Sequence, residues 1–122
     1  MKVALTLIVV QQNPNVQYSH DDFFKFLLTE EGQFPSKYIS TKDITDTARD
    51  LFSEYVSVYF DWTSIELMDF RKVNITDCEV VYAIKLPNLL GIEKRGKFVS
   101  HNNKPNFESF YGRILSRKFR IF

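Results

Sequence analysis

The chain has 122 residues, enough for one domain with a real hydrophobic core and too few for two. Its hydrophobic fraction of 44% and aromatic fraction of 16% exclude a disordered chain. A formal net charge of +1 excludes a strong whole-protein attraction to nucleic acid or to an acidic membrane. We therefore expect a single globular domain over residues 1–122.

The apolar run from Val3 to Val10 predicts a buried first strand, which the turn signal Asn13-Pro14-Asn15 ends. The run superficially resembles a signal peptide. However, no small-residue cleavage site follows it, and it is too short to span a bilayer. We therefore expect a strand and no membrane segment.

The segment from Ser19 to Glu31 allows two interpretations. Ser19 followed by Asp22 is typical of a helix N-terminus, whereas Phe24 to Leu28 suits a buried strand. The residue pattern alone leaves both open.

The segment from Thr41 to Tyr55 predicts an amphipathic helix, with Thr41 as its N-cap and Asp43 in its first turn. Its apolar face is formed by Ile44, Ala48, Leu51, Phe52 and Tyr55. The opposite face carries the acids Asp43, Asp46, Asp50 and Glu54.

Four later segments are rich in β-branched and aromatic residues and predict strands: Val56–Trp62, Ser64–Arg71, Glu79–Leu86 and Gly96–Ser100. Pro87 and Gly91 mark a loop after the third of them. Asn106 is expected to cap a closing helix whose apolar positions are Phe107, Phe110, Ile114 and Leu115. Strands around one internal helix, closed by another helix, predict an α+β sandwich with a mixed sheet.

The hexapeptide Arg49-Asp50-Leu51-Phe52-Ser53-Glu54 resembles the Arg-Glu-aliphatic-x-Glu-Glu core of the Nudix box, in a degenerate form. Arg49, Leu51 and Glu54 match the pattern. Asp50 replaces its first glutamate, and Ser53 replaces its second. The likeness to the Nudix hydrolase superfamily implies a Nudix-like fold in which the predicted internal helix is the box helix.

The segment upstream, Phe24 to Lys37, resembles the Nudix strand, polar turn and Pro-Gly-Gly loop that enter the box, and this favours the strand interpretation of Phe24–Leu28. Pro35 is present, while Ser36 and Lys37 occupy the places of the glycines. Aligning on Arg49 makes this loop about two residues short, unless the register of the alignment slips.

The resemblance implies that Mg²⁺ or Mn²⁺ is held against a diphosphate. Asp50 and Glu54 stand four residues apart and project from one helix face, so they are the first candidate metal ligands, joined by Asp46 and Asp43. Glu54 and Asp50 are also the candidate catalytic carboxylates. Arg49 is expected to orient them, and Glu93 is the candidate base outside the box. Without the resemblance, the same acids describe a solvated helix face.

These departures from the box predict a Nudix-like domain whose hydrolase activity on nucleoside-diphosphate-linked compounds is weakened or lost. The alternative is a non-catalytic binding or assembly subunit, for example of a viral or ribonucleoprotein complex, with a protein partner. The basic C-terminal segment carries Arg113, Arg117, Lys118 and Arg120 interleaved with Tyr111, Phe119 and Phe122. It fits a solvated helix better than a nucleic-acid site.

The single Cys78 cannot form an internal disulfide, and this fits a reducing, cytoplasmic compartment.

Overall fold

In the computed structural model, the described residues are 2–12, 24–40, 43–57, 66–86, 93–100 and 107–119. For residues 66–68, 118 and 119 the description covers the backbone only. All statements below concern these residues.

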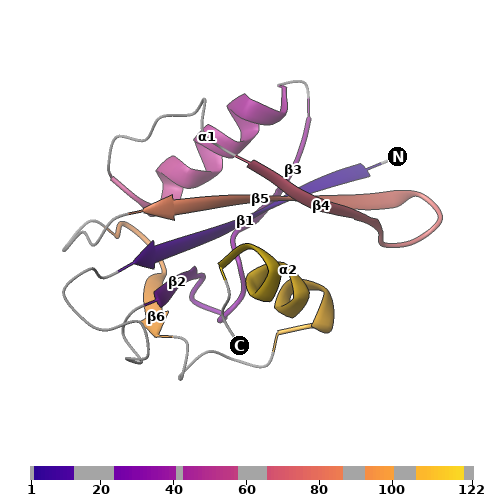
Figure 1. The fold of residues 1–122 in the computed structure, drawn as a ribbon. Coiled ribbons are helices and arrows are strands. Elements are labelled where there is room, and N and C mark those ends of the chain that lie inside the picture. The colour runs from indigo at the N-terminus through magenta and orange to yellow at the C-terminus, as the bar shows by residue number, and fades with distance from the viewer. Residues whose placement is uncertain are drawn as a thin grey trace.

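The chain forms a mixed sheet flanked by two helices, as the sequence predicts (Figure 1). The elements in chain order are β1 (Lys2–Gln12), β2 (Phe24–Leu28), β3 (Ser36–Tyr38), α1 (Ile44–Tyr55), β4 (Glu66–Lys72), β5 (Asp77–Leu86), β6 (Lys97–Ser100) and α2 (Ser109–Phe119). The strand order is β4-β5-β1-β2-β6, and β3 pairs with β1 beside this path. β1 and β5 are parallel, and the other described pairs are antiparallel.

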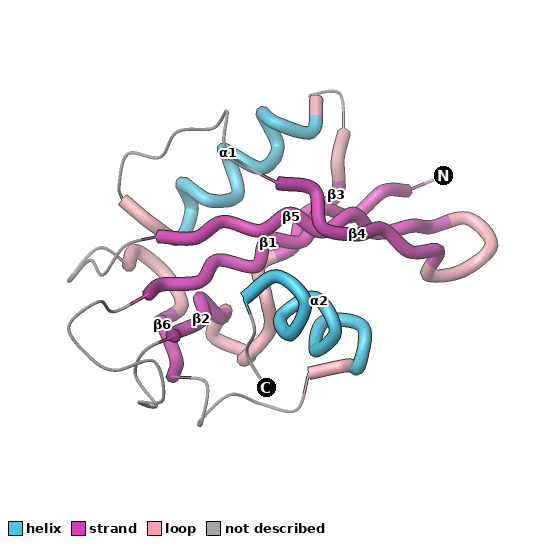
Figure 2. The backbone as a smooth tube through the Cα atoms, viewed as in Figure 1, coloured by secondary structure: helices cyan, strands magenta, loops and turns pink. Residues whose placement is uncertain are grey.

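The sheet separates two apolar clusters because α1 covers one face and α2 covers the other (Figure 2). Alternate residues of β1 point to opposite faces. Leu5 and Leu7 therefore join the α1 side, while Ile8 and Val10 join the α2 side. Burial on both faces explains why β1 is a nearly continuous apolar run.

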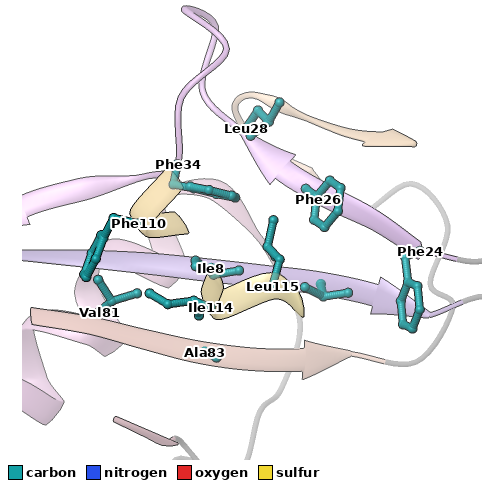
Figure 3. Close-up of a cluster of buried hydrophobic side chains, with 11 residues drawn as sticks. Ile8, Phe24, Phe26, Leu28, Phe34, Val81, Ala83, Phe110, Ile114 and Leu115 are labelled. Atoms are coloured by element: carbon teal, nitrogen blue, oxygen red, sulfur yellow. The ribbon is translucent and has the colours of Figure 1, made fainter. Parts of the chain in front are cut away.

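On the α2 side, Phe110, Ile114 and Leu115 of the helix pack over the strands (Figure 3). Their buried partners are Ile8, Val10, Phe24, Phe26, Leu28, Phe34, Val81 and Ala83. We name this set the α2-side cluster. Phe107 packs against it from the segment just before α2, so it belongs to the core without being helical.

The start of α1 differs from the predicted one. Asp43, not Thr41, is the N-cap, and its carboxylate accepts a hydrogen bond from the Asp46 amide at 2.8 Å. Ile44 is 37% exposed in the first turn, so the prediction that it is buried was wrong. Thr47 is buried there instead, because its hydroxyl donates to the Asp43 carbonyl at 3.0 Å and leaves no polar atom unsatisfied.

β2 is found as predicted, β1, β4, β5 and β6 are found with shifted ends, and β3 is an additional strand that we did not predict. Val56 forms an isolated bridge to Glu93, and residues 58–62 of the strand predicted there lie outside the described residues. The proposed cap Asn106 and the turn signals at residues 13–15, 87 and 91 also lie outside them. No helix within the described ranges is both long and apolar enough to cross a membrane.

Gly96 precedes β6 at a position that requires glycine. Its φ is +62°, and a Cβ at this residue would lie 2.1 Å from the Leu28 carbonyl oxygen. Only a residue without a side chain can adopt this conformation so close to another backbone.

Leu51 and Asp46 test the assignment of the two faces of α1. Leu51 is 2% exposed, so Leu51→Ala should lower the free energy of unfolding by about 2–5 kcal/mol. The Asp46 side chain is half-exposed, so Asp46→Ala should change the free energy of unfolding by less than about 0.5 kcal/mol. Urea unfolding followed by circular dichroism measures both values. Equal effects of the two substitutions would contradict the assignment.

Candidate functional site

The predicted box carboxylates lie on the solvent side of α1, where several already have partners. Asp43 caps the helix, as described above. The Asp46 Oδ1 atom lies 3.8 Å from Nη1 of Arg49, and both side chains are about half-exposed. Asp50 is partly buried one turn before Glu54. The helix therefore places Asp50 and Glu54 on one face, as their spacing of four requires.

Glu54 faces a lysine from a neighbouring strand. Nζ of Lys37 in β3 lies 3.5 Å from Glu54 Oε2, and the two side chains are 46% and 42% exposed. An exposed pair of this kind contributes about 0–1 kcal/mol to stability. Its larger effect is local, because it places an ammonium group beside a carboxylate that would otherwise attract a metal cation.

Glu93 lies at the C-terminal end of α1, through its bridge to Val56. The next residue fixes this arrangement: the Lys94 amide donates to the Tyr55 carbonyl at 2.7 Å, and Lys94 Nζ donates to the Ser53 carbonyl at 3.0 Å. A cation at the last carbonyls of a helix complements the helix dipole. The structure thus brings Glu93 to the same end of α1 as Glu54, from a segment 39 residues later (93 − 54).

These residues do not fit the multi-carboxylate metal cluster that the family resemblance implies. In the part of the chain that the structure describes, no three side chains of His, Cys, Asp or Glu are grouped so that they could hold a metal ion. A protein-bound Mg²⁺ usually relies on one or two carboxylates together with water and substrate oxygens. Asp50 and Glu54 together supply only these two carboxylates, and Lys37 lies beside Glu54.

A cavity of about 490 Å³ lies on the other side of the sheet, next to α2. It is lined by Thr6 and Glu79 from the sheet, by residues 31–34 and Ser36 from the β2–β3 connection and β3, and by Phe107, Glu108 and Tyr111 around the start of α2. Its volume falls within the range of about 300–1,000 Å³ that is common for small-molecule sites.

The wall of this cavity contains the buried carboxylate of Glu79, which is 5% exposed. Its Oε2 atom accepts hydrogen bonds from the hydroxyls of Thr6 and Tyr111, both at 2.5 Å. Its Oε1 atom accepts one from Nε of Arg71 at 2.8 Å. A buried carboxylate is tolerated when a cation and hydrogen-bond donors compensate it, and Glu79 has both.

Arg71 links this carboxylate to the start of α2. Its Nη1 atom donates to Glu108 at 2.7 Å, and its guanidinium lies 4.4 Å from the centre of the Phe110 ring. The hydrogen bond to Glu108 is the main reason that the pKa of Arg71 is raised, and the same bond lowers the pKa of Glu108. Arg71 therefore joins β4, β5 and the region where α2 begins.

The sequence interpretation missed Thr6, Arg71 and Glu79 as site residues. The available signal was a glutamate at a core-facing position of a strand, since Glu79 shares its face with Val81 and Ala83. Tyr111 was considered for base stacking, but its ring packs against Phe34 at 5.4 Å and its hydroxyl binds Glu79. Arg113 and Arg117 are exposed as expected, and Arg117 pairs with Asp69 at 3.5 Å.

Comparison with known proteins supports the fold. No protein-family model matches the chain, and a search of curated proteins finds no match. Among solved structures, the C-terminal domain of mouse MUTYH, in complex with human PCNA, is similar with a TM-score of 0.71 and 10% identity over 100% of this chain and 92% of that one. The NUDIX domain of Shewanella oneidensis NrtR, complexed with ADP ribose, is similar with a TM-score of 0.63 and 14% identity. This similarity covers 98% of this chain and 88% of that one.

A MutT/nudix family protein from Enterococcus faecalis is also similar, with a TM-score of 0.58 and 15% identity over 80% of this chain and 42% of that one. At these identities the likeness establishes the fold and not the chemistry. The chain therefore has a Nudix-like α+β fold.

Tyr111 should make folding stability depend on alkaline pH. Burial, followed by the hydrogen bond to Glu79, raises its pKa from 10.0 to about 12. Between these values the unfolded chain loses the phenolic proton before the folded chain does, so stability should fall as pH rises from about 10 to about 12. Unfolding in urea at several pH values measures this slope, and Tyr111→Phe should make it shallower. An unchanged slope in that variant would contradict the role of Tyr111.

Proposed function

We propose that this chain is a Nudix-like domain that binds a ligand and has weak or no diphosphate hydrolase activity. The observation that carries the proposal is the contact between Lys37 and Glu54. It places a positive charge beside one of the two carboxylates that could act together as metal ligands. Catalysis of this kind depends on concentrated negative charge that fixes the metal and leaves coordination positions open.

The remaining acids of α1 support the same proposal. Asp43 serves as the N-cap, and Asp46 lies beside Arg49. Ser53 is exposed and cannot supply a carboxylate at the position of the second glutamate. Asp50 and Glu54 remain the residues that would hold Mg²⁺ or Mn²⁺, and Glu93 the one that would assist as a base. In this proposal their capacity for such chemistry is reduced.

A nucleoside-diphosphate-linked ligand is the small-molecule class that the fold neighbours favour. The similar NrtR domain is complexed with ADP ribose, and the chain described here has a cavity of about 490 Å³ next to α2. The cavity is the feature that makes ligand binding independent of the box carboxylates.

A second candidate function is protein binding, which the β4–β5 hairpin favours. This hairpin extends beyond both helices in Figure 1, and it exposes Phe70, Val73 and Ile75 at 70%, 56% and 89%. Exposed apolar side chains close together are typical of protein contacts. The similar MUTYH domain is in a complex with PCNA, so the fold is compatible with a protein partner.

The proposal predicts little or no turnover of nucleotide sugars, dinucleotide polyphosphates or nucleoside triphosphates with Mg²⁺ or Mn²⁺. It also predicts weak Mn²⁺ binding, measured by electron paramagnetic resonance of the free ion. Lys37→Gln removes the ammonium group and should tighten Mn²⁺ binding by up to about fivefold, the equivalent of ~1 kcal/mol from an exposed charge pair. Glu54→Gln should weaken it.

Lys72→Gln is the matched control, since Lys72 is also an exposed lysine and lies on β4, away from α1. It should leave Mn²⁺ binding unchanged. Efficient turnover by the parent protein that is lost in Asp50→Asn and Glu54→Gln would overturn the proposal and identify an active hydrolase.

A further inference from the structure

β4 lies at one end of the strand order, and among the described strands it pairs with β5 alone. Its hairpin with β5 extends beyond both helices (Figure 1). The outer side of an edge strand presents backbone N–H and C=O groups that can pair with a strand of another chain. The outer edge of β4 is therefore a place where the described sheet can continue into a second molecule.

The hydrogen bonds of the hairpin show which backbone groups of β4 face outward. The Val73 amide donates to the Asp77 carbonyl of β5 at 2.9 Å. In an antiparallel pair alternate residues face the same partner, so the backbone groups of Arg71 and Asp69 also face β5. Those of Phe70, between them, face outward. The Phe70 amide accordingly donates to the Asp69 carboxylate at 2.8 Å, in an exposed hydrogen bond that a second strand can replace.

The side chains at this edge differ between the two faces of the sheet. Arg71 bonds to Glu79 and Glu108, so it is held on the α2 side. Asp69 is two residues away and lies on the same side, because alternate side chains of a strand share a face. Phe70 lies on the α1 side and is 70% exposed. The edge thus carries one acid and one base on one face and an exposed aromatic ring on the other.

A second copy of β4 complements these features in one register. A two-fold axis repeats the strand in reverse order, and opposed residues of an antiparallel pair share a face. An axis through Asp69 would oppose two aspartates, and an axis through Arg71 would oppose two arginines. Like charges directly opposite each other destabilise a strand pair. An axis through Phe70 instead places Asp69 of each copy opposite Arg71 of the other, and it brings the two Phe70 rings together.

We propose that this chain forms a symmetric dimer in which the β4 strands of two copies pair antiparallel around Phe70 and join the two sheets into one. The inference rests on the second candidate function, protein binding, and deepens it by naming the partner as a second copy. The outward backbone groups of Phe70 bond to the same groups of the other copy. The pairing is short, because the register of β4 is irregular between Leu67 and Asp69. The dimer is therefore expected to dissociate on dilution.

Sedimentation equilibrium at protein concentrations up to about 0.1 mM should show a monomer–dimer equilibrium. Asp69→Arg would oppose two pairs of arginines and should weaken dimerisation by about tenfold or more. Glu31→Arg is the matched control, since it makes the same charge change at an exposed residue in the turn after β2, which β5 and β1 separate from β4. It should leave dimerisation unchanged, and circular dichroism checks that both variants fold. A monomer at every concentration, or equal losses in the two variants, would overturn the proposal.

Disulfide trapping tests the register directly. In a Cys78→Ser background, Phe70→Cys places two thiols opposite each other, with Cα atoms about 5.5 Å apart and within reach of a disulfide. Lys72→Cys is the matched control, because Lys72 is exposed and lies on the same face of β4. The proposed register sets Lys72 opposite Met68 of the other copy, so the two Lys72 positions are about 13 Å apart along the strands. Oxidation should link Phe70→Cys at least about tenfold faster, and equal rates would overturn the register.

The outcome separates from that of the proposed loss of activity. A dimer that also hydrolyses diphosphates efficiently would support the β4 pairing and overturn the loss of activity. A monomer without turnover would overturn the β4 pairing alone.

Discussion

The buried carboxylate of Glu79 is the interaction on which the α2 side of the molecule depends. Its donors come from β1, β4 and α2, and Arg71 extends the contact to Glu108 just before the helix. Removing one partner of such a buried charge costs far more than the pair contributes, because the other charge stays desolvated. The elements that supply the donors must therefore keep their relative positions, and the cavity between them keeps its shape.

β3 connects the two sides of the sheet although it has only three residues. Successive side chains of a strand point to opposite faces. Ser36 therefore lines the cavity, while Lys37 reaches Glu54 on α1. Neighbouring residues of β3 thus act on both faces: Ser36 borders the cavity, and Lys37 lies beside Glu54.

Periodicity predicted the elements that are long and strongly patterned. The apolar run predicted β1, and apolar residues repeating every 3.6 positions predicted α1. The order of strands and helices along the chain predicted the fold class. β3 escaped prediction because its three residues are all exposed, so no burial pattern marks them. The network around Glu79 escaped because Thr6 and Glu79 are 73 residues apart, and pairing at that separation is set by the parallel register of β1 and β5.

The stability of this fold depends on its two apolar clusters far more than on the exposed acids Asp46 and Glu54. The buried clusters on both faces supply apolar burial, at roughly 25 cal/mol for each Å² removed from water. Asp46 and Glu54, by contrast, form exposed ion pairs that contribute little. Substitution at such acids changes the surface charge of α1 with little effect on folding. Substitution of the exposed acids on α1 should therefore leave the cavity next to α2 formed, since the two depend on different residues on opposite faces of one sheet.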